Sequence, residues 1–323
     1  MDDQYYINII TTCDKLNERT RELYLKKLHI IQHNFYSGKH VSIDYVIHNP
    51  SVFLQELNTY AKNHHGLLLT ELGDHSKESF ISPIKTLFLH NKQLYECNKD
   101  LYEEWILIHD IIRKPIDYKY ATNVPTERQK NAYISYDDIV LIRNALPIGS
   151  YERLLFSMYT YIPPVRSDYN DTLILNSKPD MDSNITSNFI VMNHEENYLC
   201  LQKYKTVKTY GIKVIDLPDD LVKEIKSSLE FMPRPYLFIS TLTNNKYNNG
   251  EAFNAWANRR IKSITQNKNM TLTMLRHIYI CRRDLMLEEK SGLEREQISK
   301  IMGHSLMQQQ KYLWHTWLRS INE

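Results

Sequence analysis

Near the end of the chain, three kinds of side chain suited to phosphate chemistry follow one another. Arg276 and His277 come first, His304 follows Gly303, and Tyr312 comes eight residues after His304. An arginine can bind two phosphate oxygens at once, a histidine can exchange a proton, and a tyrosine hydroxyl can act as a nucleophile. Each residue alone is more often structural, so their order and spacing matter most. Together they could attack a phosphodiester.

Helices must position these residues. Apolar spacing predicts a helix over residues 272–287, with Arg276 amid its apolar pattern. A second helix over residues 295–302 ends at Gly303, the residue type favoured just past a helix end. His304 would therefore leave that helix at its tip.

The next helix would carry Tyr312. Ser305 and Gln308 have the spacing of a capping box, which starts a helix. Tyr312 would then lie about two turns into it. His304 and Tyr312 could thus converge on one phosphate.

Short strands are predicted between the helices of the same region. A helix over residues 151–161 stops at Pro163-Pro164, and strand-like stretches follow at 172–176 and 188–192. A hairpin is predicted to begin at 198, turn near Gly211 and return through 212–217. The expected fold class is therefore mostly α with a small antiparallel β-sheet (α+β).

The chain of 323 residues is long enough for two domains. We expect an N-terminal helical arm (1–42), a helical domain (43–114), a linker (115–132) and a second domain (133–323). No apolar run of about 18 residues predicts a membrane span, and the acidic N-terminus does not resemble a secretory signal. The four scattered cysteines predict reduced thiols in an intracellular compartment rather than disulfides or a zinc site: Cys13, Cys97, Cys200 and Cys281.

Positive charge is concentrated in two segments, although the formal net charge is only +2. Residues 252–283 contain seven basic residues and no acid, and residues 197–215 contain four lysines and no acid. A polyanion such as double-stranded DNA responds to such local fields rather than to total charge. The residues expected to bind DNA are Lys203, Arg259, Arg260, Lys262, Arg282 and Arg283.

Taken together, the pattern resembles the tyrosine recombinase (integrase) family. The matching segments are Leu275-Arg276-His277, Met302-Gly303-His304-Ser305, Tyr312, Pro163-Pro164-Val165-Arg166 for the first arginine, and Lys205-Thr206 for the hairpin lysine. The Pro-Pro-x-Arg and Met-Gly-His-Ser variants look most like integrases of large DNA viruses and virophages. The resemblance is specific over residues 135–320 and architectural for the helical N-terminal part, which would be a core-binding domain.

The resemblance implies a site-specific recombinase. Tyr312 would attack the scissile phosphate and form a 3′-phosphotyrosyl link, while Arg166 and Arg276 hold the non-bridging oxygens. His304 would add a hydrogen bond or proton transfer, and Lys205 would protonate the leaving 5′-oxygen. The family acts as homotetramers on double-stranded DNA without metal, cofactor or ATP. The similarity to viral integrases implies that this chain acts in a host cell or virion.

Three positions depart from the family pattern. Thr273 stands where a histidine is usual, and His277 cannot replace it because adjacent helix residues point about 100° apart; we expect His277 to support the fold. Asp168 follows the first arginine by two residues, where the family has a supporting acid three residues on. Lys208 also lies at the hairpin turn and competes with Lys205.

Two alternatives remain open. A type IB topoisomerase shares the Arg, Lys, Arg, His and Tyr chemistry but acts as a monomer on one duplex. A DNA-binding relative that has lost catalysis is the other, with Thr273 as its first sign. The apolar stripe at residues 313–318 could dock on a neighbouring subunit, which would favour the recombinase, or pack on its own domain.

Overall fold

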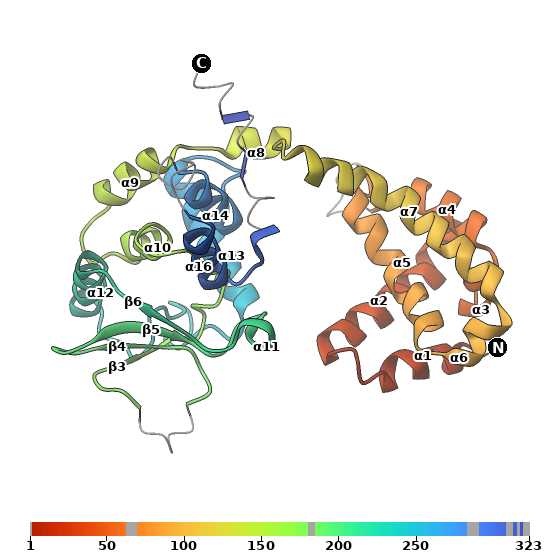
Figure 1. The fold of residues 1–323 in the computed structure, drawn as a ribbon, viewed down its shortest axis with the longest axis horizontal. Helices are drawn as coiled ribbons and strands as arrows, with labels where there is room; N and C mark the ends of the chain where they lie inside the picture. Colours follow the sequence, from red (N-terminus) through yellow and green to blue (C-terminus); the bar gives the residue numbers. More distant parts are fainter. Residues whose placement is uncertain are drawn as a thin grey trace. The chain divides into compact units, whose positions relative to one another are not determined.

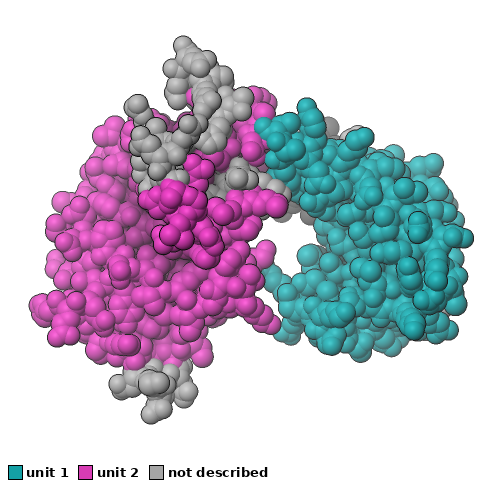
Figure 2. All heavy atoms as spheres, viewed as in Figure 1, with its two compact units in different colours: residues 1–122 teal, residues 123–323 magenta. Residues whose placement is uncertain are grey.

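The computed structural model describes residues 2–62, 70–179, 185–282, 291–307, 313–314 and 317–318. The chain divides into two compact units, Met1–Thr122 and Asn123–Glu323, which are coloured separately in Figure 2. Tyr312 and Arg283 lie outside the described residues, as do parts of the two helices predicted around them.

The first unit is helical. Its elements are α1 (Asp3–Thr12), α2 (Glu18–Asn34), the short 3₁₀ helix η1 (Tyr36–Gly38), α3 (Ile43–His48), α4 (Pro50–Thr59), α5 (Asp74–Leu89), α6 (Lys92–Cys97) and α7 (Lys99–Thr122), with a short antiparallel pair of β1 (Ala61–Lys62) and β2 (Thr70–Glu71). Trp105 is fully buried among them, and its indole N–H donates to the carbonyl of Ile47 at 2.9 Å. Apolar residues from all the longer helices form one core.

The boundaries inside this half of the chain differ from those expected. Tyr6 and Ile10 of α1 are fully buried in the same core as Phe53 and Phe80, so residues 1–42 are part of the unit rather than a separate arm. Helix α7 continues through the first half of the expected linker as far as Thr122. Pro115 lies inside α7, where the neighbouring buried residues hold the helix despite the missing N–H donor.

The second unit combines helices with a four-stranded sheet (Figure 1). Its elements are α8 (Glu127–Ala132), α9 (Tyr136–Ala145), α10 (Tyr151–Thr160), β3 (Leu173–Leu175), β4 (Phe189–Met192), β5 (Asn197–Leu201), α11 (Val207–Tyr210), β6 (Lys213–Asp216), α12 (Asp219–Phe231), α13 (Gly250–Thr265), α14 (Leu272–Ile280) and α16 (Gly292–Met302). The expected fold class, mostly helical with a small sheet, is confirmed in this respect.

The sheet is mixed rather than antiparallel, which corrects one part of the prediction. Strand order is β3-β4-β5-β6, and β3 pairs with β4 in parallel while the other two pairs are antiparallel. A parallel pair requires a crossover connection, and the chain from 176 to 188 is long enough to supply one. The strand pattern alone gave no information about direction.

Helix α10 forms the centre of the unit. Seven consecutive residues, 154–160, are buried, and α10 contacts α9, α12, α13 and α14. A helix that is buried on all sides is a rigid support, because each neighbouring helix packs against it. Arg166 lies a few residues after its end, and Arg276 lies on the contacting helix α14.

The end of the chain packs against its own unit. Trp314 and Leu318 are 2% and 3% exposed, and both belong to the core that surrounds α10. Trp314 stacks on His277 with 4.3 Å between ring centroids and 14° between ring planes. His277 therefore supports the fold, as expected, and the apolar stripe of the tail is covered within the same unit.

Candidate active site

The loop that carries Arg166 is fixed from both sides. The hydroxyl of Tyr159 on α10 donates to the carbonyl oxygen of Arg166, and the backbone N–H of Arg166 donates to the Asp168 carboxylate at 3.1 Å. Gly250 begins α13 beside this loop, and a Cβ there would lie 2.6 Å from the Ser167 hydroxyl oxygen. The absence of a side chain at Gly250 thus lets the loop approach the helix closely.

Arg276 is almost completely buried on α14. The side chain is 2% exposed, and its Nη2 donates to the carbonyl of Met302 at 3.1 Å. The same nitrogen lies 3.3 Å from Nδ1 of His304. Burying an arginine charge this deeply destabilises the fold unless the charge is hydrogen-bonded or paired with an opposite charge. Its position is set by the C-terminal end of α16, which supplies Met302 and His304.

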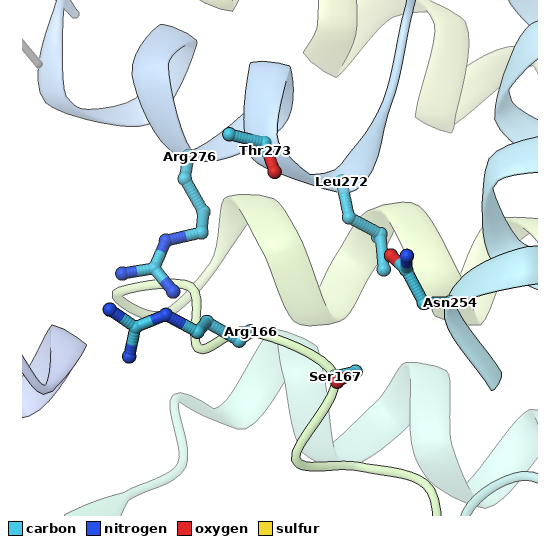
Figure 3. A pocket seen from close by; sticks show the side chains of 6 residues that line it. All are labelled: Arg166, Ser167, Asn254, Leu272, Thr273 and Arg276. Atoms are coloured by element: carbon cyan, nitrogen blue, oxygen red, sulfur yellow. The ribbon is translucent and has the colours of Figure 1, made fainter. Parts of the chain in front are cut away.

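The guanidinium groups of Arg166 and Arg276 point toward each other at one cavity, as Figure 3 shows. The cavity has a volume of about 210 Å³, and its other lining residues are Ser167, Asn254, Leu272 and Thr273. Two facing cations repel each other unless an anion lies between or beside them. The paired guanidinium groups and the surrounding hydroxyl and amide groups make this cavity suited to a phosphate group.

Asp168 is the acid that faces these cations. Burial raises the pKa of its carboxyl group, while the N–H of Arg166 and the charges of Arg166, Arg276 and Lys213 act in the opposite direction. Asp168 therefore supports the first arginine through the backbone of its loop and through its charge. The sequence predicted Asp168 as a supporting acid, two residues after the first arginine instead of three.

His304 reaches the site because the chain reverses at Gly303. Gly303 caps α16 in the left-handed conformation with φ of 71°, and His304 follows it with only 4% exposure. Burial, followed by the charges of Arg276, Arg166 and Lys213, lowers the pKa of His304 to about 3. The imidazole is therefore neutral near neutral pH. A guanidinium can only donate, so Nδ1 accepts from Arg276 and the ring hydrogen resides on Nε2.

The hairpin lysines divide into exposed and buried ones. Lys205 and Lys208 are exposed at the turn between β5 and β6. Lys203 is exposed as well, but its ammonium forms a 2.6 Å ion pair with the buried Asp171. In contrast, Lys213 at the start of β6 is 9% exposed, and its Nζ donates to the carbonyl of Ile301 at 3.3 Å.

Lys213 shares the electrostatic field of the two arginines. Burial lowers the pKa of its ammonium group to about 8; Asp168 acts against this shift, and Arg166 and Arg276 add to it. Sequence reasoning missed this lysine as a site residue. Its signal was the two-residue alternation of the strand, which places Lys213 on the same buried face as Ile215.

Ser167 and Asn254 were also missed. Ser167 adjoins Arg166 in the sequence, so its proximity could have been anticipated. Asn254 lies on α13 and reaches the cavity only through helix packing, for which the sequence holds no local signal. Thr273, at the position where the family has a histidine, is exposed and lines the cavity, so its hydroxyl is available to a bound group.

The residues expected to bind DNA have different surroundings. Arg259 is exposed on α13 and Lys262 is half-buried, whereas Arg260 lies 3.4 Å from the Glu152 carboxylate. The Arg282 guanidinium lies 4.4 Å from the ring centroid of Tyr279 and is half-buried. Lys203 and Arg260 thus have acids nearby, and Arg282 packs on an aromatic ring. The positive charges of Arg259, Lys205 and Lys208 are therefore more accessible to a partner.

The described residues contain neither a candidate metal site nor a candidate membrane span. No group of three or more His, Cys, Asp or Glu side chains there could hold a metal ion. None of the helices that the structure describes is long and apolar enough to cross a membrane. All four cysteines are free thiols.

No protein-family model matches the sequence, and no curated protein matches it. Among solved structures, the crystal structure of XerA recombinase aligns with 98% of this chain and 97% of its own, at 16% identity and a TM-score of 0.40. A likeness at this level identifies neither the family nor the site residues.

Proposed function

We propose that the protein is a site-specific DNA recombinase of the tyrosine recombinase type, which cleaves and rejoins double-stranded DNA through a 3′-phosphotyrosyl intermediate. One observation carries the proposal. Arg166 and Arg276 come from segments far apart in the sequence, yet their guanidinium groups face each other at one cavity, and His304 contacts the second arginine. Such a pair can neutralise the charge that grows on phosphate oxygens in the transition state.

Each residue then has a distinct part in the reaction. Arg166 and Arg276 hold the two non-bridging oxygens of the scissile phosphate. The Nε2–H of neutral His304 donates a hydrogen bond to one of these oxygens. Tyr312 attacks phosphorus and displaces the 5′-oxygen, which takes a proton from a lysine; the sequence pattern assigns this part to Lys205, with Lys208 as the competing choice. The bond energy stays in the phosphotyrosyl link, so rejoining requires no ATP.

The finer proposal is an integrase similar to those of large DNA viruses and virophages. It would act as a homotetramer on two duplexes, in a host cell or virion. The first unit and the exposed residues Arg259, Lys205 and Lys208 would contact the DNA backbone, whose negative charge they complement. Thr273 would add one hydrogen bond to the phosphate in place of the usual histidine.

A covalent trapping experiment on randomised DNA tests this proposal. The full chain is incubated with nicked duplexes that carry a randomised segment, so that cleavage releases a short strand and traps the protein on DNA. Adducts are separated on a denaturing gel, the captured DNA is sequenced, and the linked peptide is identified by mass spectrometry. We expect an adduct at Tyr312 that Tyr312→Phe abolishes. Absence of an adduct with the wild-type protein would refute the enzymatic proposal.

One observation keeps a type IB topoisomerase as the second candidate. The tail that could have docked on a neighbouring subunit packs in the core of its own unit, through Trp314 and Leu318. Because these residues are covered within one unit, the tail gives no support for assembly with a neighbouring subunit. Relaxation of supercoiled plasmid by the monomer, without joining of two duplexes that carry the captured sequence, would favour the topoisomerase.

A further inference from the structure

Asn188 is a fully buried polar side chain in the second unit. It is 0% exposed and stands immediately before β4. Its Oδ1 accepts the backbone N–H groups of Gln202 and Lys203 at 3.0 and 2.8 Å. Its Nδ2 donates to the carbonyls of Asp168 and Lys203 at 2.8 and 3.0 Å. The amide thus uses both lone pairs and both hydrogens, and this pattern fixes its orientation.

These hydrogen bonds join two segments that are distant in the sequence. One is the base of the β5–β6 hairpin, residues 202–203, where the chain leaves β5. The other is the loop between α10 and β3, residues 161–172, which we call the Arg166 loop. Asp168 in this loop lies 20 residues before Asn188. One side chain therefore holds the hairpin base and the Arg166 loop together.

An ion pair adds a second link between the same two segments. The ammonium group of Lys203 at the hairpin base lies 2.6 Å from the carboxylate of Asp171 in the Arg166 loop. Asp171 is 3% exposed, and a buried carboxylate that loses its partner destabilises its surroundings. The position of the loop thus depends on the hairpin base through one amide and one ion pair.

The link reaches Arg166 through Asp168. The backbone N–H of Arg166 donates to the Asp168 carboxylate at 3.1 Å, and the Asp168 carbonyl accepts from Asn188. Arg166 has to be held in place, because its guanidinium faces that of Arg276 at the cavity (Figure 3) and like charges repel. Tyr159 holds the loop from α10 through the carbonyl of Arg166. Asn188 holds the loop from the sheet.

We propose that Asn188 is a positioning residue that holds Arg166 opposite Arg276, where the scissile phosphate binds. The ion pair between Asp171 and Lys203 is the second part of the same support. This inference rests on the proposed recombinase function. Asn188 does not line the cavity, so it acts on the phosphate only through the Arg166 loop. An error of about 1 Å in the position of such a group can lower a rate about 10²-fold.

A double-mutant cycle separates positioning from a general loss of structure. Adduct formation is measured in single turnover at saturating captured duplex for the wild type, Asn188→Ala, Arg166→Ala and the double variant. We expect Asn188→Ala to slow the reaction about 10- to 100-fold while Arg166 is present. In the Arg166→Ala background it should have little further effect, because the group that it positions is gone. A purely structural role would slow both backgrounds to the same degree.

Val191→Ala is the matched control on β4. Val191 is 0% exposed in a cluster separate from the core around α10, so its truncation removes packing without touching the Arg166 loop. The folded variant should keep the wild-type rate at saturating duplex.

Lys203→Met is a second test of the support, which stays valid if Asn188→Ala does not fold. The Lys203 side chain is 61% exposed, and its replacement removes the ion pair while the Asn188 hydrogen bonds remain. We expect a smaller loss of rate than with Asn188→Ala and the same dependence on Arg166.

Hydrogen exchange tests the support without relying on catalysis. The amides of residues 166–172 should exchange several-fold faster in Asn188→Ala and Lys203→Met than in the wild type, whereas those of α10 should keep their wild-type rates. The inference is wrong if exchange in the Arg166 loop does not change, or if Asn188→Ala slows adduct formation equally with and without Arg166. If the wild-type protein forms no adduct, the proposed function fails, and exchange of the loop alone then decides whether Asn188 holds Arg166.

Discussion

At the scale of single residues, the described part of the site brings Arg166, Arg276 and Lys213, all buried or half-buried, together with Asp168. Arg166, Arg276 and Lys213 all interact with Asp168. Positive charge gathered in this way suits an anion such as a phosphodiester, which carries one negative charge in the ground state and develops more in the transition state. Bringing like charges together in a poorly solvated place is expected to lower the stability of the free protein.

Lys213 should therefore reduce the stability of the fold. Its pKa is lowered to about 8 in the folded protein, against about 10.4 in an unfolded chain. Below pH 8 the folded protein must bury the charged form, and above pH 8 it releases the proton, so wild-type stability rises with pH up to about 10.4. We expect Lys213→Met to raise the free energy of unfolding at pH 7 by about 1–2 kcal/mol.

Urea unfolding at several pH values measures this difference. The gain of Lys213→Met over the wild type should shrink between pH 8 and about 10.4, because the buried ammonium loses its charge over this range. Lys205→Met is the control and should show no such pH-dependent gain, since Lys205 is exposed. A destabilised Lys213→Met would show that the lysine holds the fold together instead.

His304 should remain neutral well into the acid range. Its pKa is lowered to about 3, first by burial and then by Arg276, Arg166 and Lys213. Between about pH 6.5 and 3 the unfolded chain binds a proton that the folded chain does not, so the contribution of His304 to stability falls as pH falls through this range. Nuclear magnetic resonance of labelled histidine, assigned with His304→Asn, should show hydrogen on Nε2 at pH 7 and no protonation of Nδ1 down to about pH 4. Charging near pH 6.5 would contradict the buried geometry.

At the scale of elements, the β5–β6 hairpin and the end of α16 position each other. The Thr206 hydroxyl donates to the carbonyl of Gly303 at 3.1 Å, and Lys213 donates to the carbonyl of Ile301 two residues earlier. A helix C-terminus has unsatisfied carbonyls and partial negative charge, both of which favour such donors. The hairpin therefore fixes the turn from which His304 enters the site.

Gly303 should be sensitive to the smallest substitution. It has φ of 71°, and an added Cβ would lie 3.1 Å from the Thr206 hydroxyl oxygen. The left-handed conformation alone costs about 1 kcal/mol for a residue with a side chain, and the crowding adds to it. We expect Gly303→Ala to lower the free energy of unfolding by about 1–3 kcal/mol and to slow adduct formation.

Gly292 is the matched control on the same helix. It stands at the first position of α16, its φ is not positive, and an added Cβ would meet no atom within 4 Å. Gly292→Ala should leave stability and adduct formation near the wild-type values or stabilise the helix slightly. Equal effects of the two substitutions on thermal unfolding would show that the tight turn at Gly303 is not the cause.

At the scale of the whole molecule, the chain consists of two units with separate cores. The core residues of the first unit lie between Tyr6 and Ile112, and those around α10 lie between Ala132 and Leu318. Arg166, Arg276, Lys213 and His304 all belong to the second unit. The described side chains of the candidate site therefore all come from the second unit.

Each unit should fold when it is expressed alone. We expect residues 1–122 and 123–323 each to unfold cooperatively on heating, with helical circular dichroism spectra, because each has its own apolar core. The 123–323 fragment should retain the phosphate site but bind a captured duplex much more weakly than the full chain. Aggregation or non-cooperative unfolding of either fragment would show that the cores depend on each other.

Much of the local architecture followed from the sequence. The end of α10 before Pro163-Pro164, the glycine after α16 and the strands of the hairpin all follow from residue types within a few positions. Such features depend on backbone preferences and short-range periodicity, which a sequence displays directly. The pairing of Arg166 with Arg276 was anticipated only through a family resemblance, since no local rule links residues so far apart.

Tertiary packing decided the rest. The parallel pairing of β3 with β4, the entry of Asn254 into the cavity and the burial of Trp314 depend on which surfaces meet in three dimensions. Lys213 is the clearest case, because the fold places its ammonium group beside Gly303, a residue far away in the sequence. The sequence determined which chemical groups were present and which short elements carried them. The contacts between distant segments determined which groups share one electrostatic field, because that field acts through space and not along the chain.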